Sequence, residues 1–159
     1  EGIGFIDALF TSVSAVCVTG LIVVDTGTHF TVFGQSVILA LIQIGGLGIL
    51  TFASYFSYLF KGGASYENQL ALSDINSSNK ISEVFKTLSY ILGITLVVEM
   101  LSAAAIYFSV DPAIFASWNE RIFFSVFHAI SAFCNAGFST LSGSVYTGSF
   151  AFNYGFQLI

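Results

Sequence analysis

Residues 10–20 have the sequence FTSVSAVCVTG, and residues 127–137 have the sequence FHAISAFCNAG. The two segments are identical at five of eleven positions, at a constant offset of 117 residues. Both are short, apolar and end in glycine. This match predicts an internal repeat, whose unit we read as a short helix, a Gly-containing turn, an extended stretch and a membrane-spanning helix.

The composition assigns this repeat to a membrane protein. Of the 159 residues, 55% are hydrophobic and only 8% are charged, whereas soluble domains contain about 25% charged residues. Four Lys and Arg stand against nine Asp and Glu, which excludes a basic nucleic-acid binder. The chain contains no G-x-S-x-G or H-E-x-x-H motif, so nothing indicates an enzyme.

Two segments are long enough to cross a bilayer whose hydrocarbon core is roughly 30 Å thick. Residues 33–60 contain no charged residue, and residues 87–110 contain only Glu99. The apolar segments 5–18 and 122–134 are too short, because a helix rises about 1.5 Å per residue. We therefore expect an all-α membrane fold in which two helices span and two shorter helices enter and return.

The basic residues orient these segments. Lys61, Lys80 and Lys86 lie between the two spans, and basic loops face the cytoplasm. Residues 61–86 are therefore expected to be cytoplasmic in a plasma (inner) membrane, with both short helices and their loops facing outward. Because the chain begins without Met and ends in a new apolar run, we expect it to be part of a longer protein.

A short helix that enters from outside points its C-terminal end, which carries partial negative charge, at the membrane centre. The residues that follow it would return outward, and their carbonyls could replace the hydration shell of an ion. Glycine can adopt positive φ there, whereas a Cβ would narrow the pore or rotate a carbonyl away. The alternative is that Gly20 and Gly137 are simple helix caps. The expected filter consists of Val18, Thr19, Gly20, Leu21, Asn135, Ala136, Gly137 and Phe138.

The residues also carry a resemblance that covers nearly the whole chain. Residues 14–21 (SAVCVTGL), 23–27 (VVDTG) and 33–35 (FGQ) resemble the first pore loop of the Trk/Ktr/HKT superfamily of potassium transporters. Residues 41–48 (LIQIGGLG) are similar to the helix that follows it, and residues 127–139 (FHAISAFCNAGFS) to the second pore loop.

The resemblance implies four helix–loop–helix repeats around one pore, of which this chain holds parts of two. Residues 1–60 would be repeat one, residues 61–86 a cytoplasmic connection and residues 87–159 repeat two. Repeats three and four of the same chain would then be missing partners. The resemblance further implies a homodimer and a cytosolic nucleotide-binding regulatory ring. The implied cargo is K+, with no covalent cofactor.

Two acidic side chains each allow two interpretations. Asp25 could guard the outer mouth of the pore, or cap the loop through Thr26 and Gly27. Glu99, in mid-span, is a functional candidate by default, but we favour a structural carboxylate that is neutral or bonded to backbone donors.

The cysteines and the glycines of the first span are given structural roles. Cys17 and Cys134 occupy equivalent positions in the repeat, and we interpret them as free thiols that act as small hydrophobes. The glycines of residues 45–48 would allow close packing of helices.

The sequence therefore predicts a pore-forming subunit for potassium uptake. The alternative is a Na+- or H+-coupled symporter, or a less selective monovalent cation transporter, with the same fold. A carrier built from broken helices would show inverted repeats, whereas this repeat is parallel. The sequence does not contain the motifs of an intramembrane protease.

Overall fold

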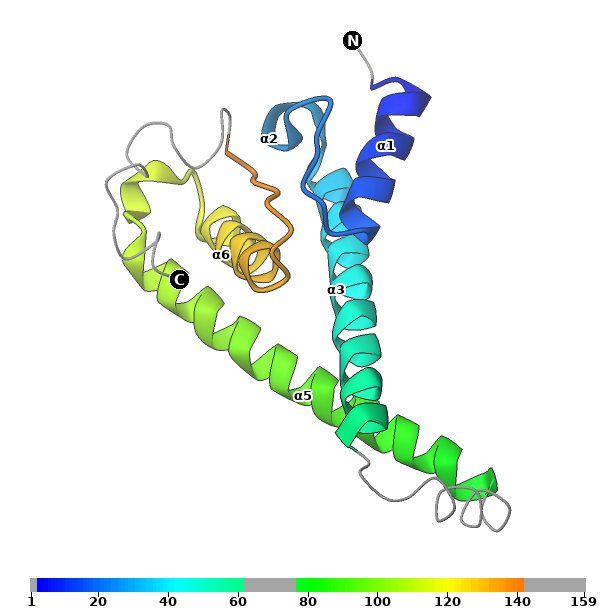
Figure 1. Cartoon of the computed structure of the whole chain (residues 1–159). Helices are drawn as coiled ribbons and strands as arrows, with labels where there is room; N and C mark the ends of the chain where they lie inside the picture. The colour runs from blue at the N-terminus through cyan, green and yellow to red at the C-terminus, as the bar shows by residue number, and fades with distance from the viewer. Residues whose placement is uncertain (1–2, 62–76, 142–159) are drawn as a thin grey trace. The chain divides into compact units, whose positions relative to one another are not determined.

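The computed structural model describes residues 3–61 and 77–141, and every regular element in these ranges is helical. This confirms the expected all-α class. The elements in chain order are α1 (Phe5–Val16), α2 (Thr26–His29), α3 (Val32–Lys61), α5 (Ser77–Ser109), the short 3-10 helix η1 (Pro112–Ile114) and α6 (Trp118–Phe133). Figure 1 shows the course of the chain through them.

The chain divides into two compact units. The first consists of Glu1–Gly46 and Val97–Ile159, and it holds both short helices and the loops that follow them. The second consists of Leu47–Leu96, which includes the last part of α3 and the first part of α5. Within it, the Thr51 hydroxyl donates a hydrogen bond to the Leu47 carbonyl over 2.7 Å. The candidate site lies in the first unit.

Two helices are long and apolar enough to cross a membrane. Their apolar windows are Val32–Thr51, of 20 residues, and Leu88–Ser109, of 22 residues. Only 22% and 17% of these windows are buried within the chain, which suits helices whose remaining surface meets lipid. Helix α5 begins at Ser77, so the end of the predicted cytoplasmic connection is helical. Residues 62–76 of that connection lie outside the described residues.

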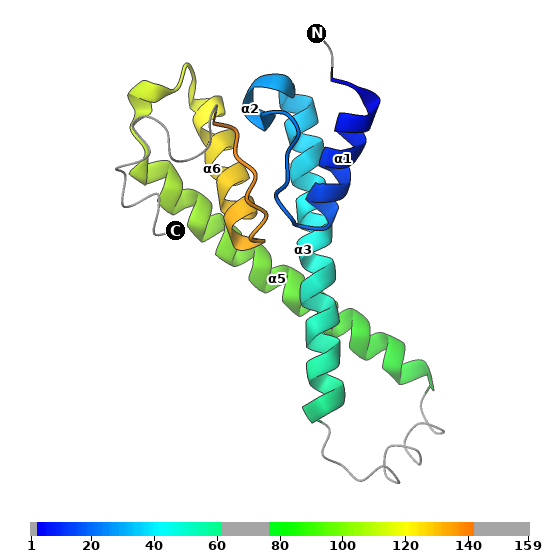
Figure 2. The same ribbon diagram turned by 45° about the horizontal axis from the view of Figure 1, so that its top comes forward.

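The two short helices are followed by loops that turn back. Helix α1 has 12 residues and α6 has 16, which corresponds to about 18 and 24 Å of rise, less than a bilayer core. After each helix the chain reverses at its C-terminal end and runs back along it (Figures 1 and 2). The predicted short helices and returning loops are therefore confirmed, and their re-entry into a membrane stays a prediction.

Helix α6 begins four residues earlier than the predicted segment 122–134. The side chain of Ser117 accepts a hydrogen bond from the Glu120 backbone N–H, and the Glu120 carboxylate accepts one from the Ala116 N–H over 3.0 Å. The first bond satisfies a donor that the first turn of a helix leaves free, and the second ties the helix to the residue before its cap. The prediction missed this start because the polar residues 119–121 precede the apolar run, and it considered only that run.

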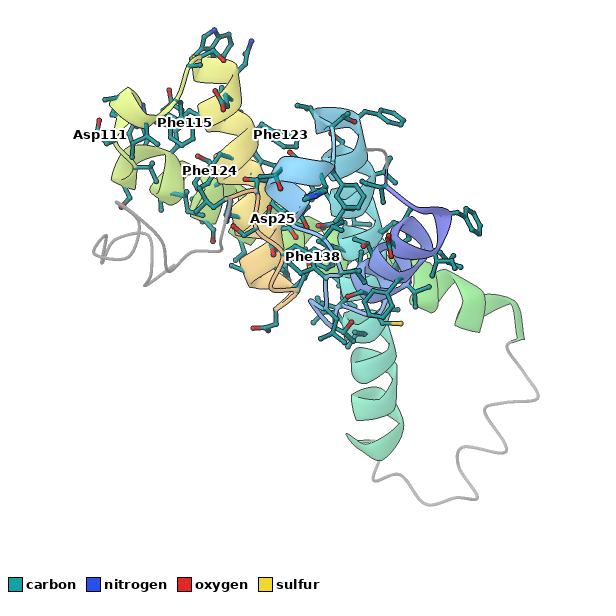
Figure 3. All side chains as sticks on the ribbon, turned by 90° about the horizontal axis from the view of Figure 1, so that it is seen from above. Asp25, Asp111, Phe115, Phe123, Phe124 and Phe138 are labelled. Atoms are coloured by element: carbon teal, nitrogen blue, oxygen red, sulfur yellow. The ribbon has the colours of Figure 1, made fainter. Side chains whose placement is uncertain are left out.

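Two hydrophobic clusters position the first unit. One joins α1, α3, α6 and the loop after α6, through Ala15, Ile38, Ile42, Phe127, Ala136 and Phe138. The other joins α5 to α6 through Ile106, Val110, Phe124 and Ala129. Phe115 extends the second cluster, with its ring 5.2 Å from that of Phe124, as Figure 3 shows from above.

Arg121 connects α6 to the end of α5. Its guanidinium donates hydrogen bonds to the carbonyls of Tyr107 and Val110 and lies 4.0 Å from the centre of the Tyr107 ring. Cations are favourable at a helix C-terminus, where carbonyls lack intrahelical partners. The bridge holds the N-terminal end of α6 against the C-terminal end of α5.

The glycines of α3 differ in what surrounds them. A Cβ on Gly45 would overlap the Val16 carbonyl at the end of α1, and one on Gly46 would lie 2.5 Å from the Cys134 Sγ. Both therefore allow the close packing that the sequence predicts. Around Gly48 the described residues leave open space, so its packing role stays a prediction.

These glycines give a matched pair of variants. Gly45→Ala should lower the free energy of unfolding by about 1–3 kcal/mol, because the new methyl group meets backbone rather than a movable side chain. Gly48→Ala should leave it unchanged or raise it by up to about 1 kcal/mol, because alanine is the better helix former. Thermal unfolding of the full-length protein in detergent measures both. Equal effects would contradict the packing described here.

Candidate functional site

Both short helices end in the same turn. The N–H groups of three successive residues bond back to carbonyls three to five residues earlier, in the same register in each repeat. The pairs are Cys17–Val13, Val18–Ala15 and Thr19–Ser14 in the first repeat, and Cys134–Ile130, Asn135–Ala132 and Ala136–Ser131 in the second, at 2.7–3.1 Å. The 117-residue repeat is therefore a repeat of backbone geometry.

The backbone beyond these helices alternates into the left-handed region. Val18 and Asn135 have φ of 54° and 55°, and Gly20 and Gly137 have φ of 71° and 72°. The residue that caps a helix in this conformation is normally Gly or Asn, so Asn135 suits its place, whereas the β-branched Val18 is strained there. The interpretation of the two glycines as simple caps is wrong, because they lie two residues beyond the capping position.

Most backbone carbonyl groups of these loops accept no hydrogen bond within the described part of the chain. Among the described residues, no hydrogen-bond donor is recorded on the carbonyl oxygens of residues 18–21 and 135–137. The Phe138 carbonyl differs, since it accepts a bond of 2.7 Å from the Ser131 hydroxyl. Of residues 18–21 and 135–137 only Ala136 is buried, so most of the row is accessible, and accessible carbonyl oxygens with free lone pairs are suited to a ligand that carries positive charge.

The two loops meet at their glycines. A Cβ on Gly20 would overlap the Ala136 carbonyl oxygen, while one on Gly137 would lie 3.8 Å from the Gly20 Cα. Gly27 likewise lies against the Thr140 carbonyl. The structure thus brings together residues that are more than a hundred positions apart, and only glycine fits at position 20.

The two loops differ in how far their last residues are buried. Ala136 and Phe138 are 1% and 3% exposed, whereas Leu21, the repeat equivalent of Phe138, is 60% exposed. The serines at equivalent positions of α1 and α6 also have different hydrogen-bond partners. Ser131 holds the Phe138 carbonyl, while Ser14 pairs with the Thr19 hydroxyl over 3.0 Å. The first loop therefore has a face that this chain does not cover.

His128 on α6 forms a hydrogen bond with the end of the second loop. Its Nδ1 lies 2.9 Å from the Phe124 carbonyl and its Nε2 lies 3.1 Å from the Ser139 hydroxyl. Burial lowers the pKa of His128 to about 4, so the imidazole is neutral at physiological pH. Nδ1 must donate to the carbonyl, and Nε2 then accepts from Ser139, which fixes the residue that follows Phe138.

Comparison with known protein families identifies the family of the chain. The model of the TrkH family, described as cation transport protein, matches residues 1–158. The chain belongs to the TrkH family.

Curated relatives extend this assignment. The chain is 40% identical over 145 residues to the potassium/sodium uptake protein NtpJ of Enterococcus hirae, covering 91% of this chain and 32% of that protein. It is 42% identical over 137 residues to the Ktr system potassium uptake protein B of Bacillus subtilis, covering 86% of this chain and 30% of that protein. The chain thus spans about a third of the length of the curated relatives it matches.

Asp25 in this TrkH-family chain caps α2. Its carboxylate accepts hydrogen bonds from the backbone N–H groups of Gly27 and Thr28, at 2.8 and 3.2 Å. The side-chain amide of Gln35 closes the other end of the helix, donating to the carbonyls of Thr26 and Phe30. The capping interpretation of Asp25 is confirmed, and its role at an outer mouth stays a prediction.

Glu99 lies in the apolar span of α5 and is 5% exposed. Its bonding partner is the side chain of Gln43 on α3, whose amide donates over 3.1 Å. The expected backbone donors are thus replaced by a side-chain donor, which sequence reasoning missed. Cys17 and Cys134 are free thiols, as expected. Residues 142–159, which include most of the predicted outer loop, lie outside the described residues.

The two buried serines of α6 test the anchor of the second loop. Ser131→Ala should lower the free energy of unfolding by about 1–3 kcal/mol, because the Phe138 carbonyl loses its donor. Ser125→Ala should cost less than about 1 kcal/mol, because Ser125 bonds only the Arg121 carbonyl of its own helix. Thermal unfolding in detergent compares them, and a larger loss for Ser125→Ala would refute the anchor.

Proposed function

We propose that this chain contributes to a pore for potassium uptake, and that the loops 18–21 and 135–138 bind dehydrated K+ through backbone carbonyls. The observation that carries the proposal is the row of carbonyl oxygens without hydrogen-bond donors, on loops with alternating positive φ. Such carbonyls can replace the hydration shell of a cation. In this role the Phe138 carbonyl, held by Ser131, would form the outermost position.

The two short helices support cation binding electrostatically. Each directs its C-terminal end toward the turn that begins its loop. The last carbonyls of a helix carry partial negative charge, equivalent to about half an elementary charge. Two such ends, in a medium with little water, favour a cation near the start of both loops. Asp25 adds negative charge at the far end of the first loop.

A complete pore needs more protein than this chain provides. Several apolar side chains of α1 are exposed on the surface of this chain, among them Phe5, 81% exposed, and Ile6, 78% exposed. Together with Leu21 they leave room for further repeats beside the first one. By resemblance to the family, we propose two further repeats of the same chain, a second copy of the protein, and a cytosolic nucleotide-binding ring. With Lys61, Lys80 and Lys86 on the cytoplasmic side, the loops would open outward.

The second candidate is a symporter coupled to Na+ or H+. One relative is named a potassium/sodium uptake protein, which favours Na+ as a second cargo. The same loops would then bind both ions, with weaker discrimination. Cation uptake measured with and without a Na+ gradient, in cells lacking other potassium systems, separates the two candidates.

Substitution of the loop glycines tests the proposal. Gly20→Ser should reduce the preference for K+ over Na+ by roughly tenfold or more, because the new side chain displaces the Ala136 carbonyl and strains a left-handed residue by about 1–3 kcal/mol. Gly137→Ala should slow uptake with a smaller change in selectivity, because there is space for its methyl group and only the strain remains. Uptake of both ions by cells expressing the full-length protein gives the ratio.

Gly93→Ala, on α5 with open space around it, is the control and should keep normal uptake. Selectivity and rate unchanged in both loop variants, at equal expression, would contradict the proposal.

A further inference from the structure

Two buried oxygen atoms in the first unit lack hydrogen-bond partners although they belong to bonded side chains. They are Oε1 of Glu99 and Oε1 of Gln43. The other ends of the same groups are joined, since Gln43 Nε2 donates to Glu99 Oε2 over 3.1 Å. The pair therefore makes one of the two hydrogen bonds that a carboxyl group and an amide can share.

The protonation state of Glu99 decides whether the second bond can form. An ionised carboxylate has no donor, and the oxygen of a primary amide is also only an acceptor. With Glu99 ionised, both Oε1 atoms would be acceptors without donors. Buried polar atoms in that state are costly, and they are rare in native structures.

In the described part of the chain, no positively charged side chain is recorded beside Glu99. The titratable group recorded next to Glu99 in the described part of the chain is the Cys134 thiol, at the end of α6. Cys134 is a free thiol, and a thiol carries no positive charge in either protonation state. An ionised carboxylate without a cation in the middle of a span is expensive.

We propose that Glu99 binds a proton at Oε1, donates it in a hydrogen bond to Gln43 Oε1, and so closes a two-bond acid–amide pair between α3 and α5. The proton is taken from water, and no other bond changes. The pair joins a helix of the first repeat to a helix of the second, beside the Cys134 that ends α6. The inference does not depend on which ion the loops bind.

A proton fits this site better than a metal ion. Both unpartnered atoms are buried within the chain itself, so a larger ligand would need the side chains to move apart. Hard cations take about six or more oxygen ligands, whereas this site offers two. Within residues 3–61 and 77–141, no group of three or more His, Cys, Asp or Glu gathers to hold a metal.

Infrared difference spectroscopy on the full-length protein in lipid tests the proposal directly. The spectrum of the wild type minus that of Glu99→Gln, at neutral pH, should contain the C=O stretching band of a protonated carboxylic acid, shifted in D2O. Glu120→Gln is the control: its carboxylate is exposed to water, so its difference spectrum should contain carboxylate bands only. Carboxylate bands alone in the Glu99→Gln difference would overturn the proposal.

The stability of Glu99→Gln gives a second, independent outcome. Glutamine presents an N–H where the protonated acid presents its O–H, so the variant can keep both hydrogen bonds with Gln43. The variant should fold, and its unfolding temperature should lie within a few degrees of that of the wild type. A Glu99→Gln protein that fails to fold would contradict a neutral acid at this position. Gln43→Met should move the acid band to higher frequency, because the proton loses its acceptor.

Discussion

The physical constraint on this fold is that a chain which reverses direction inside a membrane must find partners for its own peptide groups. At the ends of α1 and α6, three N–H groups find partners by bonding back into the helix. The carbonyls that follow have none among the described residues. In water such groups would be hydrated, whereas in hydrocarbon each one is costly. In the function proposed here a cation removes that cost, so the turn that ends each short helix would also provide a site for an ion.

The rest of the first unit holds this turn in place. Gly45 lets α3 approach the end of α1, and the cluster around Phe127 fixes α6 against both. Ser131 and His128 fasten the outer end of the second loop through the Phe138 carbonyl and Ser139. A carbonyl site needs such support, because its oxygens repel one another when no ion is bound. The proposed acid–amide pair of Glu99 and Gln43 would add a polar contact between α3 and α5.

Sequence reasoning predicted the two long apolar helices, the two short helices with returning loops and the register of the repeat, because hydrophobic length and a constant offset determine them. It missed the start of α6, which depends on a polar cap at Ser117. It expected positive φ at Gly20 and Gly137, which the structure has, but it did not expect positive φ at Val18 and Asn135, because a valine in that conformation follows no propensity. The Gln43–Glu99 and His128–Ser139 contacts join residues 56 and 11 positions apart. Neither spacing is that of a helix turn or a known motif, so only the folded chain reveals them.

The central claim is that the carbonyls of the two glycine loops bind a dehydrated cation. Anomalous diffraction from crystals of the full-length protein grown in Rb+, a close substitute for K+, tests it most directly. The account predicts an anomalous peak between residues 18–21 and 135–138, within coordination distance of their carbonyl oxygens. A peak that appears only elsewhere, or its absence from between the loops while they keep the conformation described here, would contradict it.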